Sequence, residues 1–148
     1  MSKLAIPTFK NLLAQQKNAL TNFLGDEQNA LRFMSSAVHC VQKTPELLEC
    51  TQESLMSAFM QCAANNLYPS NFSGDAYILP YGSKNGKQAQ FQIGYQGLKT
   101  LAYRAGILRC GAEVVYENDE FKQLLGTDQR LHHVPAVSNR GDAIGVYG

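Results

Sequence analysis

The chain has 148 residues, of which 45% are hydrophobic, and a formal net charge of +1. This length and apolar content suit one compact domain rather than several. No apolar run approaches the roughly 18 to 20 residues that cross a bilayer, and the N-terminal end lacks the basic-then-apolar pattern of a signal peptide. We therefore expect one soluble domain over residues 1–148, with a helical region at 1–68, a strand-rich core at 69–148 and no membrane partner.

Apolar residues recur every three or four positions through residues 1–68, a period that predicts helices. The first stripe comprises Phe9, Leu12, Leu13, Leu20, Phe23 and Leu24, and the second comprises Leu31, Met34, Val38 and Val41. Gly25-Asp26 separates these two predicted helices. Thr44-Pro45-Glu46 predicts the start of a third helix, because a capping hydroxyl precedes a proline at the first helical position. Asn65-Asn66 predicts its left-handed end.

After Pro69 the apolar period changes to two, which predicts strands. Residues 77–81 and 89–95 form a predicted hairpin around an Asn85-Gly86 turn, and Pro80 indicates an edge strand. A short helix closed by Gly106 and a strand over 107–116 follow. Further strands are expected at 121–125, 130–134 and 143–147. The predicted fold class is α+β, with the N-terminal helices packed on a mostly antiparallel sheet whose core runs strand, strand, helix, strand.

Residues 76–112 contain no aspartate or glutamate, although they hold five cations and five aromatic residues. These are Lys84, Lys87, Lys99, Arg104 and Arg109, with Tyr77, Tyr81, Phe91, Tyr95 and Tyr103. Cations neutralise phosphates and rings stack on unpaired bases, so this composition favours a single-stranded nucleic acid. Outside the segment, Arg130, His132 and Arg140 form a candidate second patch.

We predict a groove in which the cations hold the sugar-phosphate backbone while Tyr81 or Tyr95 stacks on bases. The cations are Lys84, Lys87, Lys99, Arg104 and Arg109. Uncharged donors and acceptors accompany them at Gln90, Gln92 and Gln96. If all five cations contact single-stranded phosphates, the logarithm of affinity falls with the logarithm of salt at a slope of roughly −3.5, from about −0.7 per contact.

The sequence shows no catalytic constellation. Gly86-Lys87 lacks the earlier glycine and following hydroxyl of a phosphate loop, since Tyr81 and Gln88 stand at those positions. The four cysteines are isolated, so neither disulfides nor a metal site are expected, and Cys40 and Cys62 are predicted to be buried thiols. The acidic run 117–120 is interpreted as a solvated turn.

Several blocks of sequence resemble the RecT and Red-beta family of phage-type single-strand annealing proteins, and specifically its RecT branch. They are DAYILPYG at 75–82, QIGYQGL at 92–98, LAYRAG at 101–106, AEVVYE at 112–117, DEF at 119–121, LHH at 131–133 with Pro135, and IGVY at 144–147. The resemblance implies ATP-independent binding of single-stranded DNA and annealing of complementary strands in phage-type homologous recombination and repair. It also implies a DNA-binding protein that is not an enzyme.

The same resemblance implies partners and a setting. The partners are single-stranded DNA and the annealed duplex, further copies of the chain in a ring or helical filament, and a phage exonuclease. No cofactor is required, while a role for Mg²⁺ in annealing stays open. The implied location is the cytoplasm of a bacterium or phage-infected host. Because relatives extend beyond the strand that ends here at Tyr147, we expect a C-terminally shortened, incomplete domain.

Two other functions fit the same residues. A passive module would bind single-stranded DNA or RNA and protect it, which slows pairing of complementary oligonucleotides instead of accelerating it. An oligomerisation fragment without annealing activity would keep its DNA affinity when Lys84 and Lys87 are both changed to alanine.

Overall fold

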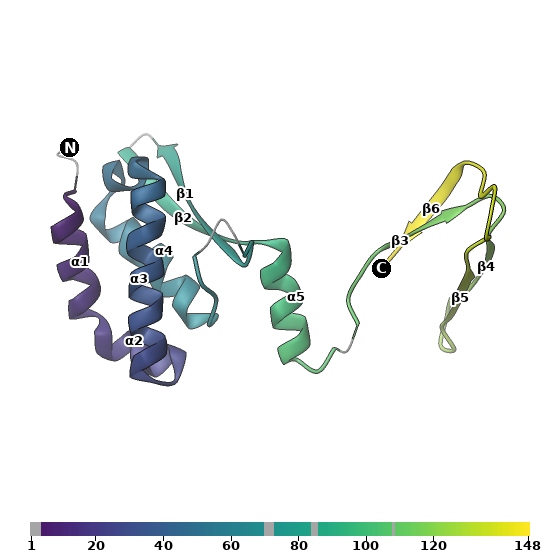
Figure 1. The fold of residues 1–148 in the computed structure, drawn as a ribbon, viewed down its shortest axis with the longest axis horizontal. Coiled ribbons are helices and arrows are strands. Elements are labelled where there is room, and N and C mark those ends of the chain that lie inside the picture. Colours follow the sequence, from purple (N-terminus) through teal and green to yellow (C-terminus); the bar gives the residue numbers. More distant parts are fainter. Residues whose placement is uncertain (1–3, 70–72, 84–85, 108) are drawn as a thin grey trace. The chain divides into compact units, whose positions relative to one another are not determined.

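The computed structural model describes residues 4–69, 73–83, 86–107 and 109–148. The chain separates into two compact units, an N-terminal unit, Met1–Ala105, and a C-terminal unit, Gly106–Gly148, each described below by itself (Figure 1). The predicted hairpin belongs with the helices, so the division does not follow the expected change from helices to strands at residue 68. The single-domain description stays a prediction.

The N-terminal unit begins with four α-helices and a short 3₁₀ helix. They are α1 (Ile6–Gln15), α2 (Lys17–Leu24), α3 (Glu27–Lys43), the 3₁₀ helix η1 (Pro45–Glu49) and α4 (Gln52–Ala64). The first predicted stripe is thus divided at Gln16 into two helices. Asp26 caps α3, where its carboxylate accepts a hydrogen bond from Asn29 N at 2.7 Å, as an N-cap requires.

The predicted start of the third helix is confirmed only for a short 3₁₀ helix, η1, which begins at Pro45. Thr44 forms no side-chain cap, and Pro45 opens the 3₁₀ turn, which brings Leu47 and Leu48 into the core. The α-helix begins only after Thr51, whose hydroxyl accepts from Ser54 N at 3.3 Å. Thr44 and Thr51 could each cap a helix. Because Leu47 and Leu48 are buried by the 3₁₀ turn, the α-helix starts after Thr51. The predicted left-handed end is confirmed, because Asn66 has a φ of 49°.

The core lies among these helices and the hairpin that follows them. Its largest fully buried side chains are Phe9, Phe33, Phe59, Leu13, Leu20, Leu47, Leu55 and Leu67. Phe9 and Phe59 join α1 to α4 with ring centroids 5.3 Å apart. α3 packs on α1 and α2, while α4 packs on α2 and on the second strand of the hairpin. Truncating one such buried phenylalanine to alanine typically costs about 3–5 kcal/mol.

The hairpin consists of β1 (Ala76–Ser83) and β2 (Gly86–Ile93), which pair antiparallel. Ala89 lies opposite Pro80, and the amide of Ala89 points away from β1 because it donates to Ser54 Oγ at 3.0 Å. Facing residues of an antiparallel pair either exchange both backbone hydrogen bonds or exchange neither. Pro80 therefore occupies a position that needs no N–H, as expected for a proline in an outer strand.

The two faces of the hairpin differ in composition. The face toward the helices carries Ala76, Ile78 and Ala89, which are buried, and Phe91 and Ile93, which pack against the core. The opposite face carries the alternate residues of both strands. Since side chains alternate along a strand, this opposite face includes Gln88, Gln90 and Gln92.

After the hairpin, α5 (Tyr95–Arg104) begins at Gly94 and lies against the backbone of residues 74–75. A Cβ at Gly94 would lie 2.0 Å from Gly74 O, and a Cβ at Gly97 would lie 2.0 Å from Asp75 O. Gly94 N also donates to Asp75 O at 2.9 Å. Only glycines permit this approach, which fixes the first turn of α5 beside the start of β1.

The C-terminal unit contains four short strands in two antiparallel pairs. β3 (Glu113–Tyr116) pairs with β6 (Ala143–Tyr147), and β4 (Glu120–Leu124) pairs with β5 (Arg130–Val134). The predicted strand over 107–116 begins only at Glu113. The α+β class and the order strand, strand, helix, strand are confirmed. Instead of one sheet, however, the described residues form three two-stranded sheets, and β3 pairs with β6 rather than with the hairpin.

The helices carry no membrane-spanning pattern. Across the described ranges, none is long and apolar enough to cross a bilayer.

Candidate nucleic-acid interface

The side of the hairpin away from the helices combines rings, an aliphatic side chain and amides. Tyr77, Leu79 and Tyr81 on β1 face Gln92, Gln90 and Gln88 on β2, and we call these six residues the outer hairpin face. All three glutamines are exposed, and Tyr81 is 45% exposed. The face offers aromatic surfaces and neutral hydrogen-bonding groups but no formal charge.

The first two turns of α5 add a cation and a more exposed ring. Lys99 Nζ lies 5.5 Å from the centroid of the Tyr95 ring, within cation–π range, and Tyr95 is 62% exposed. Gln96 is also exposed. A Cβ at Gly74 would meet both Tyr77 Oη, at 3.4 Å, and Gln96 Cγ, at 3.6 Å, so the α5 residues adjoin the outer hairpin face.

Lys87 departs from the predicted groove. It faces Gly82 across the ladder and so shares the helix-facing side with Ala89, two residues along. Its ammonium lies 2.6 Å from a carboxylate oxygen of Glu49, and this hydrogen bond raises the pKa of Lys87. A carboxylate from the helical region thus balances a charge that the sequence assigned to phosphate.

The other predicted cations besides Lys87 and Lys99 are Arg104, Arg109 and Lys84. Arg104 is exposed and its guanidinium donates to Asn65 O at 3.2 Å, while Arg109 belongs to the C-terminal unit. Lys84 lies outside the described residues. Within the described ranges, neither Lys99 nor Arg104 forms an ion pair with a carboxylate. The structure therefore brings Tyr81, Gln90, Gln92, Tyr95, Gln96 and Lys99 into one surface of the N-terminal unit, whereas Lys87 lies on the opposite face of the hairpin.

The candidate second patch is offset by acidic neighbours. Arg130 lies 3.6 Å from Asp128, and His132 lies 3.8 Å from Glu120. Arg140 stacks 4.1 Å above the Tyr116 ring and is bound to a buried carboxylate. These three side chains do not form a cationic surface.

That buried carboxylate is Asp119, which the sequence placed in a solvated turn. Its side chain is fully buried and accepts from Arg140 NH2 at 2.6 Å, from His133 Nε2 at 3.0 Å and from the Tyr116 and Ala136 amides. His133 Nδ1 lies 2.9 Å from Tyr147 Oη, which extends the network to β6. The Arg140 hydrogen bond, more than any other contact, lowers the pKa of Asp119. The solvated-turn interpretation is wrong for Asp119, although Glu117 and Glu120 are exposed.

The four cysteines are free thiols; Cys62 is buried, as predicted, whereas Cys40 is only partly buried. Burial raises the pKa of Cys40 to about 11 and that of Cys62 to about 12. Cys62 Sγ lies 3.1 Å from Leu67 O. In the part of the chain that the structure describes, no group of three or more histidine, cysteine, aspartate and glutamate side chains could hold a metal ion.

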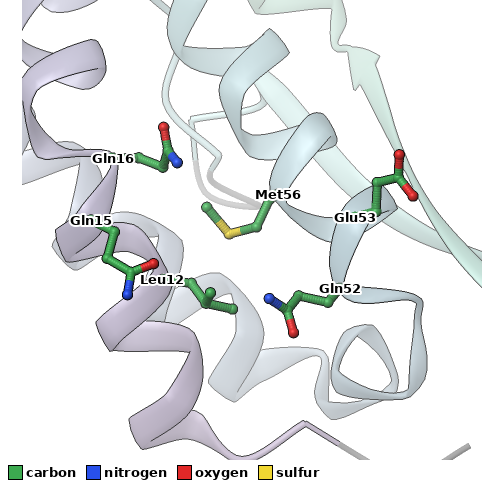
Figure 2. Close-up of a pocket in the computed structure, with 6 residues that line it drawn as sticks. All are labelled: Leu12, Gln15, Gln16, Gln52, Glu53 and Met56. Atoms are coloured by element: carbon green, nitrogen blue, oxygen red, sulfur yellow. The ribbon is translucent and has the colours of Figure 1, made fainter.

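A cavity of about 460 Å³ lies between α1 and α4 (Figure 2). Its lining comprises Leu12, Gln15, Gln16, Gln52, Glu53 and Met56. The amides and the single carboxylate surround an apolar floor, without a nucleophile and base pair or a cation. The cavity shares no residue with the outer hairpin face.

Comparison with known proteins now identifies the family. The RecT family matches residues 31–148. Protein RecT of Escherichia coli (strain K12) is 37% identical over 136 residues, which cover 88% of this chain and 51% of that protein. The chain thus spans about half the length of this curated relative. It belongs to the RecT family.

Proposed function

We propose that this chain binds unpaired DNA on the outer hairpin face and the first turns of α5, and promotes annealing of complementary strands without ATP. Membership of the RecT family supports recombination by annealing as the general role. The observation that carries the proposal is the row of exposed glutamines, with Tyr81 exposed and Tyr77 partly exposed, that continues into Tyr95 and Lys99.

The chemistry of this surface suits annealing. A ring that stacks on a base covers its flat face and leaves its Watson–Crick edge accessible to a second strand. Glutamine amides donate to phosphate or sugar oxygens and accept from base amino groups, so they tolerate many sequences. Lys99 provides a positive charge beside the Tyr95 ring.

The positions of the cations change the expected salt dependence. If only Lys99 and Arg104 contact phosphates, the slope of log affinity against log salt is roughly −1.4, from about −0.7 per contact on a single strand. A phosphate contact by Lys84 would make it roughly −2.1 by the same rule. Both values are shallower than the slope expected for five cations, so stacking provides a larger share of the binding free energy.

Annealing of two complementary labelled oligonucleotides without nucleotide tests the proposal. We expect the chain to accelerate pairing at concentrations that saturate the strands. Tyr95→Leu keeps the apolar bulk of the side chain but removes the ring, so it should lose affinity by about 1–3 kcal/mol at high salt. Slower pairing at full occupancy would show that the chain protects single strands instead of annealing them. If the chain does not bind the oligonucleotides at all, the outer hairpin face is not a DNA-binding surface.

Assembly, partner and ion dependence follow the same proposal. We propose that copies of the chain form a ring or filament on DNA, that an exonuclease provides the strands, and that Mg²⁺ is not required for binding. Sedimentation with and without oligonucleotide measures assembly, and oligonucleotide binding with and without chelator measures the Mg²⁺ dependence.

A further inference from the structure

We infer that Ser54 is a positioning residue, whose hydroxyl fixes the hairpin in the register that presents the tyrosines and glutamines outward. This inference rests on the proposed function only for its consequence on DNA binding. The structural part stands on hydrogen bonds between the start of α4 and β2.

The outer edge of β2 is bound by the segment that precedes and begins α4. Ala89 N donates to Ser54 Oγ at 3.0 Å, and Thr51 N donates to Lys87 O at 2.9 Å. Residues Cys50 and Lys87 form a parallel bridge. Ala89 is buried, so its amide requires a protein partner in place of water.

The serine hydroxyl is itself held in place. It donates to Thr51 O at 3.0 Å and accepts from Thr51 Oγ1 at 2.8 Å, while Thr51 Oγ1 also accepts from Ser54 N. The helix cap therefore orients the acceptor that receives the Ala89 amide. One short segment thus caps α4 and attaches β2.

Register is the property that this contact controls. A slip of one residue turns every side chain of a strand to the opposite face. In β2, a slip would bring Gln88, Gln90 and Gln92 against the helices and expose Ala89. It would also turn the Ala89 amide from Ser54 toward β1. Pro80 opposes the same slip from β1, because a hydrogen-bonded position requires the N–H that proline lacks.

An isosteric pair tests the role of the hydroxyl. Ser54→Thr keeps it and Ser54→Val replaces it with a methyl group, at equal branching. We expect hydrogen exchange at the Ala89 amide to become about tenfold faster or more in the valine variant, because a buried donor loses its acceptor, and to stay near wild type in the threonine variant. Equal exchange in the two, with both near wild type, would overturn the inference.

A face-specific label separates register from simple loosening. In a Cys110→Ser background, which removes the exposed cysteine, Gln90→Cys should react readily with maleimide. With Ser54→Val added, the maleimide reaction of Gln90→Cys should become slower. In a separate variant, Ala89→Cys should become reactive, because the slip exposes that position. If the β-branched side chains of both variants disturb α4, the unbranched Ser54→Ala variant shows whether loss of the hydroxyl alone has the effect. Retained protection at Ala89 in that variant contradicts the inference, and lost protection supports it.

DNA affinity then tests the link to function. If Ser54→Val changes exchange and labelling and also weakens oligonucleotide binding severalfold, both proposals are supported. If register changes while affinity does not, the outer hairpin face is not the DNA surface and the positioning role still holds. If register is unchanged, the positioning role fails whatever the affinity.

Discussion

The ammonium of Lys87 lies on the side of the hairpin that faces the helices, 2.6 Å from the Glu49 carboxylate. Lys99, twelve positions later, lies beside an exposed ring and forms no ion pair among the described residues. Two lysines of the same acid-free segment therefore have different electrostatic surroundings. A carboxylate distant in sequence produces the difference.

Replacing each lysine with methionine removes the charge and keeps most of the side chain. We expect Lys99→Met to make the salt slope of oligonucleotide binding shallower by about 0.7, the loss of one phosphate contact. Lys87→Met should leave the slope unchanged and alter affinity less than about twofold, since an exposed pair contributes little. Fluorescence anisotropy across a salt series measures both. The opposite ranking would place Lys87 in the DNA surface.

Asp119 illustrates a charge with a structural role. It joins the turn after β3 to β5 through His133 and to the later loop through Arg140. This role could not be predicted from the sequence, because an acidic residue among acidic neighbours is usually solvated. An arginine and a histidine within about twenty residues of an aspartate are common in sequences. Their presence therefore does not predict a hydrogen-bond network before the fold is known.

The pH dependence of the C-terminal unit should reveal this carboxylate. Its pKa is lowered in the folded state, so near the ordinary value of about 3.9 the unfolded chain binds more protons. The stabilisation is complete above that value and is lost as pH falls toward the folded pKa. We expect the unfolding midpoint of the wild type to fall between about pH 5 and pH 3 more steeply than that of Asp119→Asn. Parallel curves would contradict this.

At the scale of elements, α5 depends on two glycines that bring its backbone against residues 74–75. The sequence predicted this helix and the hairpin before it from their apolar periods. It did not predict their contact, which depends on the space available at Gly94 and Gly97. Apolar periodicity thus predicts the helix and the hairpin, whereas the missing side chains at Gly94 and Gly97 determine how closely the two pack.

Gly97→Ala tests this contact. The added Cβ would lie 2.0 Å from Asp75 O, a backbone atom that cannot rotate away. We expect about 1–3 kcal/mol of destabilisation, from overpacking, and weaker DNA binding because Tyr95 and Lys99 move with the helix. Gly82→Ala is the matched control, since its Cβ would meet nothing within 4 Å. Denaturant titration and anisotropy compare the two variants, and equal stabilities would disprove the close contact.

The candidate site was predictable in composition and only partly in geometry. Alternation along a strand is enough to put Gln88, Gln90 and Gln92 on one face of β2, whereas the sequence did not decide whether Tyr81 is exposed. The same alternation puts Lys87 on the other face, although the predicted groove placed it beside Gln90 and Gln92. Its pairing with Glu49 did not follow from alternation, because that contact joins η1 to β2 across tertiary structure.

At the scale of the whole molecule, the two units differ in their cores. Apart from Val115, the buried hydrophobic side chains among the described residues belong to the N-terminal unit. The C-terminal unit is near the roughly 40-residue size below which a hydrophobic core rarely suffices alone. Its stability relies more on hydrogen bonds and on the aromatic contacts of Phe121, His133 and Tyr147.

Unfolding should therefore occur in two steps. We expect amides of β3 to β6 to exchange through openings of lower free energy than those of α3 and α4, because smaller cores open at lower cost. Hydrogen-exchange mass spectrometry along a denaturant series resolves the two groups of peptides. One common midpoint for all peptides would show a single cooperative unit instead.

The proline in β1 has a consequence for assembly. A neighbouring chain that tried to lengthen the sheet by adding a strand along this rim would find one rung of its hydrogen-bond ladder missing at Pro80, near the middle of the strand. Copies of the chain are thereby discouraged from fusing through their hairpins into an aggregate. An assembly of copies that lengthened the sheet through β1 would therefore forgo this hydrogen bond, which disfavours that mode of joining.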